Sequence, residues 1–120
     1  MPLLGHGKVC HIALPATDVE ASAAFYESVF GWRMHRDGGR ITFDDSVDEV
    51  SGHFDPRLAP AGPGLLVYLM VDDLHDALAR LVAAGAAVVE PPGADPGELT
   101  ARFRDPGGNV LGVYQEPPQP

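Results

Sequence analysis

Cysteine is almost absent from this sequence, since Cys10 is the single one among 120 residues. One thiol cannot form an internal disulfide, and it cannot supply the several thiolates of a multi-cysteine zinc site. Cys10 and its neighbour His11 are not expected to act as a nucleophile and base, because adjacent residues on a strand point to opposite faces. We therefore expect neither a disulfide-stabilised fold nor thiol catalysis by this pair.

Basic residues are also scarce, with 8 Lys and Arg against 17 Asp and Glu, which gives a formal net charge of −9. This excess repels a phosphate backbone, and no cluster of Lys or Arg offsets it, so nucleic-acid binding is not expected. No apolar run approaches the ~20 residues that span a bilayer, and residues 1–11 lack a basic-then-apolar signal pattern. We expect a cytoplasmic protein without a membrane partner, whose acidity serves solubility first and a cationic ligand second.

The first half of the chain reads as a strand, a helix and three further strands. An apolar run over 8–14 predicts the first strand. Asp18 is a typical N-cap for a helix over 19–30, and Gly31 is placed to end it. The three strands that follow are predicted at 32–37, 40–45 and 49–55.

The second half repeats this order after a linker predicted at 56–63. A strand is predicted over 64–71, and Asp73 caps a helix that Gly85 ends. The last three strands are predicted at 86–90, 99–105 and 109–115. The chain is thus an internal repeat of roughly 55 residues. Superimposing the two final strands places Gly52 over Gly112.

This doubled unit, with His11 in its first strand, resembles the vicinal oxygen chelate superfamily. That superfamily contains glyoxalase I, extradiol dioxygenases, fosfomycin-resistance enzymes and bleomycin-resistance proteins. The most specific segments are His11, Asp18-Val19 with FYESVFGW, VDDL at 71–74, and FRDPGGNVLGVYQ at 103–115. The resemblance implies an α+β fold of two βαβββ units, each a half-barrel cup, in one domain over 1–120. Unit one would span about 8–55 and unit two about 64–116. Because dimers are common in the superfamily, the resemblance also implies a homodimer.

Metal-using members of the superfamily place ligands on the first and last strand of each unit. The matching positions are His11, about Gly52, about Leu66 and about Gly112, and only His11 carries a side chain that coordinates metals. One imidazole does not hold a catalytic metal, so no cofactor is expected and a divalent metal is the less favoured alternative. His53 is one residue from the expected position, where it faces away from His11 unless a bulge or another register intervenes.

Alternate strand residues should line the predicted cups, because successive strand side chains point to opposite faces. The resulting ligand-binding prediction is His11, Gly52, Phe54, Leu66, Tyr68, Gly112 and Tyr114. This lining is mainly apolar and aromatic, which suits a small and partly aromatic ligand. The alternative is that Phe54, Leu66 and Tyr68 only fill the core, and that His11 is a buried, hydrogen-bonded histidine.

Three further features each allow two interpretations. Arg102 and Arg104 share one face of their strand, where they bind a ligand carboxylate if that face is the cup and are ordinary surface charges otherwise. The acidic residues within 44–49 could attract a cation, although a solvated loop is expected. Trp32 follows the helix-ending Gly31, and we expect it to cover the seam between helix and sheet rather than to stack on a ligand.

Three functions remain open at this point. The leading hypothesis is binding of a small organic molecule without a metal centre; if there is catalysis, His11 acts as general base and Tyr68 or Tyr114 as proton donor. The second is non-enzymatic sequestration of a cationic drug, motivated by the net charge of −9. The third is a metal-dependent lyase or dioxygenase whose ligands stand in another register. A fold-level resemblance does not name the substrate.

Overall fold

A computed structural model of the chain describes residues 5–60, 64–93 and 99–117. Its contacts divide the chain into two units, Met1–Pro60 and Ala61–Pro120. This division falls inside the predicted linker at 56–63, of which residues 61–63 lie outside the described part. Each unit has one helix and a four-stranded sheet, which confirms the predicted α+β class.

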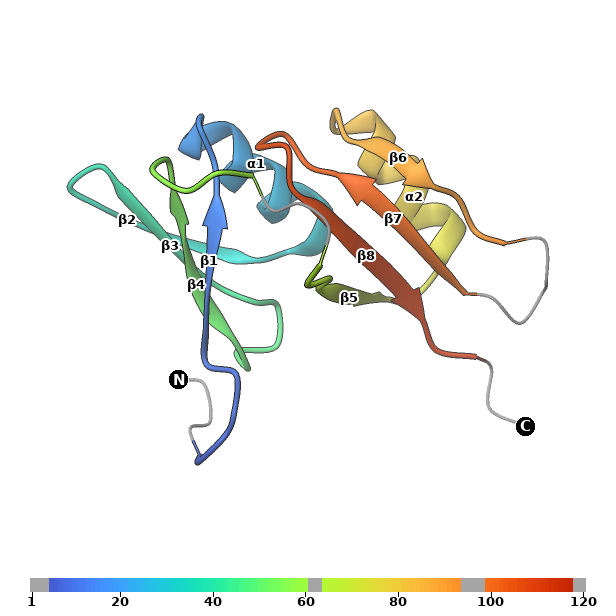
Figure 1. Ribbon diagram of the computed structural model, residues 1–120, viewed down its shortest axis with the longest axis horizontal. Coiled ribbons are helices and arrows are strands. Elements are labelled where there is room, and N and C mark those ends of the chain that lie inside the picture. Colours follow the sequence, from blue (N-terminus) through green and yellow to red (C-terminus); the bar gives the residue numbers. More distant parts are fainter. Residues whose placement is uncertain (1–4, 61–63, 94–98, 118–120) are drawn as a thin grey trace. The chain divides into compact units, whose positions relative to one another are not determined.

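Unit one has the predicted order of a strand, a helix and three strands (Figure 1). Its elements are β1 (His11–Pro15), α1 (Val19–Phe30), β2 (Arg33–Asp37), β3 (Arg40–Asp44) and β4 (Ser51–Asp55). The sheet order is β1-β4-β3-β2, with β1 parallel to β4 and the other neighbours antiparallel. The first and last strands of the unit are therefore neighbours, although a helix and two strands separate them in sequence.

Unit two repeats this arrangement. Its elements are β5 (Tyr68–Val71), α2 (Leu74–Ala83), β6 (Ala87–Glu90), β7 (Thr100–Arg104) and β8 (Val110–Gln115). The sheet order is β5-β8-β7-β6, and again the first and last strands form the parallel pair. The two βαβββ units predicted from the repeat are thus confirmed.

Both helices begin at the predicted N-caps. The Asp18 side chain accepts a hydrogen bond from the backbone N–H of Ala21 at 3.0 Å, and Asp73 accepts from that of Asp76 at 3.0 Å. Each bond satisfies a donor that the first helical turn leaves unpaired. Gly31 ends α1 in the left-handed conformation, with φ 71°. Neither helix in the described ranges is long and apolar enough to cross a membrane.

Both parallel strands begin later than the apolar runs predict. The runs at 8–14 and 64–71 become strands only from His11 and from Tyr68. These two residues are the first with register partners in β4 and β8. The pairing is prepared one residue earlier, where the Cys10 carbonyl accepts from the Ser51 N–H and the Val67 carbonyl accepts from the Gly112 N–H. Leu66 therefore precedes β5 instead of lying within it.

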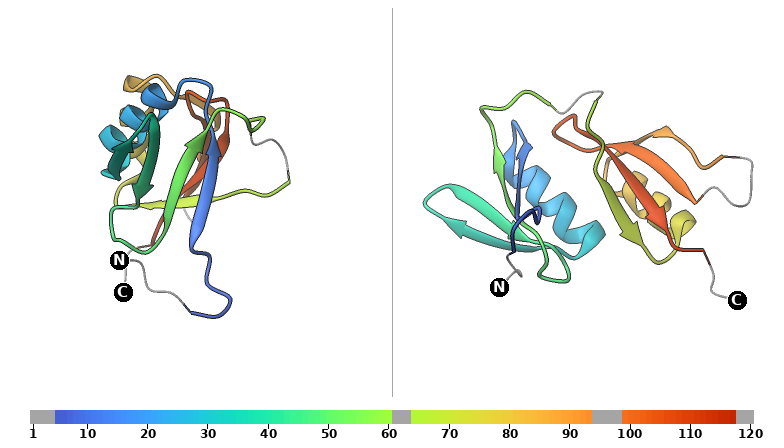
Figure 2. Two further views of the ribbon diagram at one scale, coloured as in Figure 1. Left: turned by 90° about the vertical axis from the view of Figure 1, so that its left-hand side faces the viewer. Right: turned by 60° about the horizontal axis from the view of Figure 1, so that its bottom comes forward.

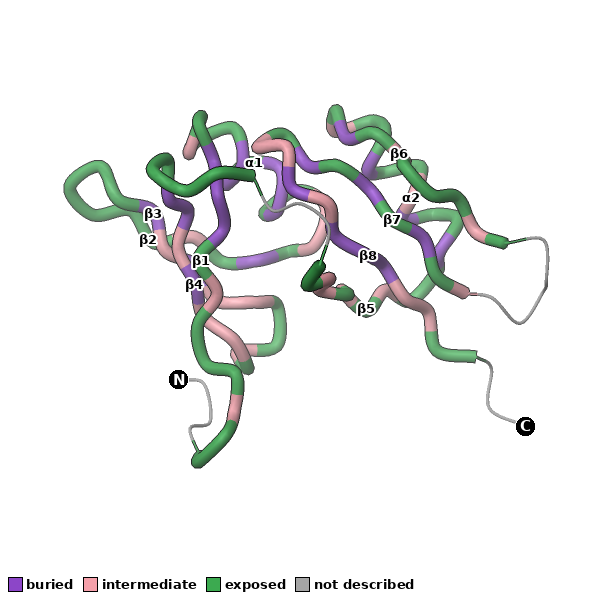
Figure 3. Tube along the Cα trace, in the orientation of Figure 1, coloured by how far each residue is buried: buried purple, intermediate pink, exposed green. Residues whose placement is uncertain are grey.

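Each helix covers one face of its own sheet (Figure 2). α1 packs on β2, β3 and β4, and α2 packs on β6, β7 and β8. Figure 3 shows the buried stretches along these elements. The largest buried side chains of unit one are Phe25, Tyr26, Trp32, Phe43 and Phe54, and those of unit two include Leu74, Leu81, Phe103, Leu111 and Val113. Among the described residues, no helix of the same unit covers the opposite face of either sheet.

Trp32 lies in the core of unit one, as the sequence predicts. Its ring stacks on Tyr26 of α1 at 4.4 Å and on Phe43 of β3 at 4.5 Å, with interplanar angles of 12° and 16°. Only 7% of Trp32 is exposed. The indole therefore joins the helix to the sheet.

Candidate functional site

The strand register shows which side chains of unit one share the face of the sheet turned away from α1. His11 pairs with Ser51 and Ala13 pairs with His53, and paired residues project to the same side. The neighbouring strands extend this set through the pairs of β3 with β4 and of β2 with β3. We call the result the helix-free face of unit one; its members are His11, Ala13, Arg33, His35, Thr42, Asp44, Ser51 and His53. It is polar, and not the mainly apolar lining that the sequence predicts.

Two imidazole rings meet on this face. Nε2 of His11 lies 2.7 Å from Nδ1 of His53, with ring centroids 5.0 Å apart. At this distance one nitrogen donates a proton and the other accepts it, so the pair shares a single proton. Nε2 of His53 stands 3.6 Å from the Asp55 carboxylate.

Asp55 is held as a carboxylate beside the histidine pair. It is 6% exposed, and the Arg57 guanidinium donates to both of its oxygens at 3.1 Å. These side-chain hydrogen bonds, together with one from the Arg57 backbone N–H, keep the pKa of Asp55 well below its usual range. The ionised Asp55 carboxylate, paired with Arg57, therefore lies next to the His53 ring.

Gly52 and Phe54 lie on the other face, which corrects the predicted lining. Gly52 pairs with Ile12, and Phe54 is 5% exposed with its ring 5.2 Å from that of Phe43. Strand side chains alternate, so an error of one residue in the register moves a whole strand's side chains to the wrong face. The superposition of the two final strands matched Gly52 with Gly112. In the structure His53, and not Gly52, lies on the helix-free face.

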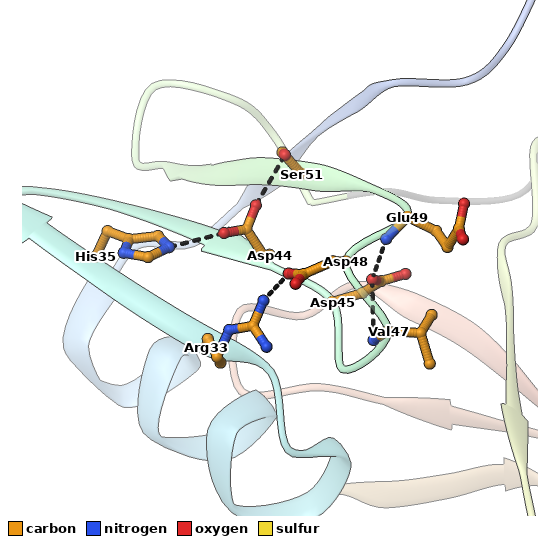
Figure 4. Close-up of polar contacts among 8 residues, drawn as sticks. All are labelled: Arg33, His35, Asp44, Asp45, Val47, Asp48, Glu49 and Ser51. Atoms are coloured by element: carbon orange, nitrogen blue, oxygen red, sulfur yellow. Dashed lines mark hydrogen bonds and ion pairs between the residues drawn. The ribbon is translucent and has the colours of Figure 1, made fainter. Parts of the chain in front are cut away.

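A second polar group on the same face centres on Asp44 (Figure 4). Nε2 of His35 lies 2.8 Å from one Asp44 oxygen, and the Ser51 hydroxyl donates to the other at 2.9 Å. The hydrogen bond from His35 and then that from Ser51 lower the pKa of Asp44 from its usual value. Asp44 lies at the end of β3, and it therefore links the two strands on either side, β2 through His35 and β4 through Ser51.

The remaining acidic residues of 44–49 form a structured turn (Figure 4). The Asp45 carboxylate accepts from the backbone N–H groups of Val47 and Glu49, at 3.3 and 2.8 Å. Asp48, with φ 60°, forms an ion pair with Arg33. These contacts give the carboxylates of Asp45 and Asp48 structural roles in this surface loop. This agrees with the interpretation favoured from the sequence.

The helix-free face of unit two carries aromatic and apolar side chains. Tyr68 pairs with Gly112 and Met70 pairs with Tyr114, so the predicted grouping of Tyr68, Gly112 and Tyr114 on one face is confirmed. Tyr68 is 47% exposed and Met70 is 60% exposed. Met70 is missing from the predicted set, although it stands two residues after Tyr68 and strand alternation places it there. Leu66 precedes the strand, and no pair assigns it to this face.

The Tyr68 ring lies directly over Gly112. A Cβ atom added to Gly112 would stand 2.5 Å from two ring carbons of Tyr68. Any side chain larger than that of glycine would occupy the space of the ring. A glycine in a strand allows this close approach. The result is a half-exposed ring that lies over the backbone of the neighbouring strand.

Two arginines complete this face. Arg102 pairs with Gly112 on β8 and with Glu90 on β6, and its Nε lies 3.4 Å from a Glu90 oxygen. Arg104 stands two residues further along β7 and pairs with Ala87. Both arginines therefore belong to the face of Tyr68, Gly112 and Tyr114, which is the condition under which the sequence predicts carboxylate binding. We call these residues, with Met70, the helix-free face of unit two.

A family model agrees with this architecture. The model of the Glyoxalase/Bleomycin resistance protein/Dioxygenase superfamily matches residues 8–113. The chain belongs to this superfamily. The match begins before β1 and ends within β8, and so includes both βαβββ units.

Several proteins resemble the chain along most of its length. A virulence protein of Salmonella typhimurium, STM3117, is 24% identical over 90% of this chain and 83% of its own. TnmS3, an antibiotic binding protein from Streptomyces sp. CB03234, is 27% identical with a TM-score of 0.72, covering 96% of this chain and all of its own. The fosfomycin resistance protein FosX from Mesorhizobium loti shares the fold, with a TM-score of 0.71 at 17% identity over 95% of both chains.

Within the described residues, the His, Cys, Asp and Glu side chains form no cluster of three or more that could hold a metal ion. Unit one offers His11 and His53, which is one donor more than the sequence predicts. The equivalent positions of unit two are Leu66 and Gly112, which have no donor atoms. The expectation that no cofactor is bound remains a prediction.

The proposed catalytic pairing of His11 with Tyr68 also remains a prediction. His11 belongs to β1 of unit one, and Tyr68 belongs to β5 of unit two. Within its own unit each side chain is accessible, since His11 is exposed and Tyr68 is 47% exposed. Each is therefore available to a ligand on its own face.

Proposed function

We propose that this superfamily member binds a small, partly aromatic organic molecule on the helix-free faces of its sheets, without a resident metal. The observation that carries the proposal is the exposed aromatic surface of unit two, where the Tyr68 ring lies over Gly112 and Met70 and Tyr114 form the next pair on the same face. Exposed apolar side chains grouped on one face commonly mark a binding site. A planar ring stacks on such a surface with little rearrangement.

The similarity to an antibiotic binding protein supports this proposal. TnmS3 matches the chain over both units at 27% identity. A binding role also needs fewer reactive groups than catalysis does, and the face of unit two carries aromatic, apolar and guanidinium groups, with the Glu90 carboxylate beside Arg102. Sequestration of a cationic drug is less well supported there, because Arg102 and Arg104 would repel a positive charge.

Replacing Tyr68 by Ala is expected to weaken binding of a neutral aromatic probe, 2-naphthamide, by about tenfold. An aromatic pair contributes about 0.5–1.5 kcal/mol beyond its buried area, and roughly 1.4 kcal/mol corresponds to a tenfold change in affinity. The measurement is a titration followed by ¹H–¹⁵N NMR spectra, in which the Gly112 amide of the unmodified chain should shift with added probe.

Val82→Ala is the matched control for this titration. Val82 is 56% exposed on α2, on the other side of unit two from Tyr68. It should therefore leave the affinity unchanged. Equal affinities for the Tyr68→Ala and Val82→Ala variants, or shifts that spare Gly112, would contradict the proposed binding face.

A metal-dependent activity is the second candidate, because His53 joins His11 on one face at 2.7 Å. Two imidazoles do not complete the three or four protein ligands of a zinc site. We expect elemental analysis of the purified protein, with and without added nickel, zinc, manganese or iron(II), to find far less than one metal ion per chain. A stoichiometric metal that is lost in the His11→Ala, His53→Ala variant would favour the metal-dependent function instead.

A further inference from the structure

We propose that the helix-free face of unit two selects aromatic molecules that carry a carboxylate group. Arg102 and Arg104 would bind the carboxylate while the ring lies on Tyr68. This inference rests on the proposed function and adds the chemical class of the ligand. It follows from the row of paired residues across the sheet, in which Tyr68, Gly112 and Arg102 stand side by side on three neighbouring strands.

The distribution of charge in unit two sets this face apart. Residues 61–120 contain three basic side chains, Arg80, Arg102 and Arg104, against eight Asp and Glu. Arg80 is paired with Asp76 on α2, at 2.9 Å. The two remaining cations of an acidic unit are therefore gathered beside its exposed aromatic residues.

Both guanidinium groups are accessible to a ligand. The Arg102 and Glu90 side chains are 45% and 61% exposed, and ion pairs this exposed are weak enough for an anion to compete. Arg104 is exposed and pairs with Ala87 and Val110, neither of which is acidic. In the described part of the chain, Arg104 takes part in no ion pair. Within the described residues, one arginine is thus weakly neutralised and the other has no acidic partner.

The spacing of the row suits a compact aromatic acid. Neighbouring strands are about 4.8 Å apart, so a carboxylate attached to a ring above Gly112 lies one strand from Arg102. Arg104 is on the same strand, two residues or roughly 6.6 Å away on the same face. Guanidinium groups bind carboxylates through two parallel hydrogen bonds, which an amide or an ammonium group cannot accept in the same way.

The test compares three probes that share one ring system, 2-naphthoate, 2-naphthamide and 2-(aminomethyl)naphthalene. At low ionic strength we expect the unmodified chain to bind the carboxylate about tenfold more tightly than the amide, and the amine more weakly than either. The Arg102→Gln, Arg104→Gln variant should lose the preference for the carboxylate and bind the amide within about twofold of the unmodified chain. Raising the salt concentration should also reduce the preference of the unmodified chain for the carboxylate.

The matched control is Arg36→Gln, Arg80→Gln, which changes the net charge equally but removes an exposed ion pair of unit one and an exposed ion pair on α2. It should keep the preference for the carboxylate. If the amide binds at Gly112 but the carboxylate binds no more tightly, or if the preference survives in the Arg102, Arg104 variant, this inference fails while the proposed function stands. If none of the probes shifts Gly112, or if its shifts follow protein concentration as they would for self-association, both fail.

Discussion

Gly52→Ala is expected to destabilise unit one by about 3 kcal/mol, which is large for the addition of one methyl group. The new Cβ would stand 2.2 Å from Cζ of Phe43 and 2.3 Å from the backbone oxygen of Ile12. Phe43 is 1% exposed and packs on Trp32, and the Ile12 oxygen belongs to the neighbouring strand, so neither can move aside without disturbing the core. Urea unfolding followed by the fluorescence of Trp32 reports on unit one directly.

Gly112→Ala is the matched control, because it makes the same change in the last strand of the other unit. The new methyl group there meets the ring of Tyr68 at 2.5 Å, and that ring is 47% exposed and free to turn outward. We expect a change in stability within about 1 kcal/mol, since an alanine also favours a strand slightly over a glycine. Equal losses in the two variants, measured by far-UV circular dichroism, would contradict the different surroundings of these glycines.

Trp32→Ala is expected to destabilise unit one by about 4 kcal/mol, within the range measured for removing large buried aromatic side chains. The substitution removes the ring that stacks on both Tyr26 and Phe43, and leaves a cavity between α1 and β3. Because the variant lacks the fluorescent residue, far-UV circular dichroism during urea unfolding is the measurement.

Trp32→Phe separates the structural role from a role in ligand binding. A phenyl ring can keep one stacking contact, so we expect a loss of about 1–2 kcal/mol and unchanged affinity for 2-naphthamide. A Trp32→Ala variant with nearly unchanged stability, or a Trp32→Phe variant with much weaker binding, would show that the indole serves a ligand and not the core.

Local signals in the sequence were enough to predict the elements and their order. Asp18, Asp73 and Gly31 act as caps through contacts within one helical turn, so their roles follow from neighbouring residues. The repeat and the superfamily followed from the same spacing, and the family model confirms the latter over residues 8–113. Trp32 was placed correctly for a similar reason, because its position directly after the helix-ending glycine leads it to the seam.

It was harder to predict which face of the sheet each strand side chain occupies. The prediction was correct in unit two and wrong in unit one, and the loops before the last strands differ. In unit two the turn before β8 is closed by Asp105, which accepts from the Asn109 backbone at 2.8 Å and from its side chain at 3.0 Å. The side-chain grouping predicted for β8 was correct. In unit one the loop before β4 contains Asp48 in a conformation that few residues other than glycine adopt, with φ 60°. No sequence signal announces it, and the prediction for β4 was wrong by one residue.

The sequence alone was enough to predict the order of the elements, the internal repeat, the superfamily and the excess of negative charge. It was not enough to predict which side chains are in contact. The contact of His11 with His53, and the gathering of Arg102 and Arg104 beside Tyr68, depend on how strands distant in sequence are paired. A register is set by the packing of the whole sheet on its helix, and a shift of one residue reverses every face. Capping and turns, in contrast, are settled within a few residues, which is why they were predictable.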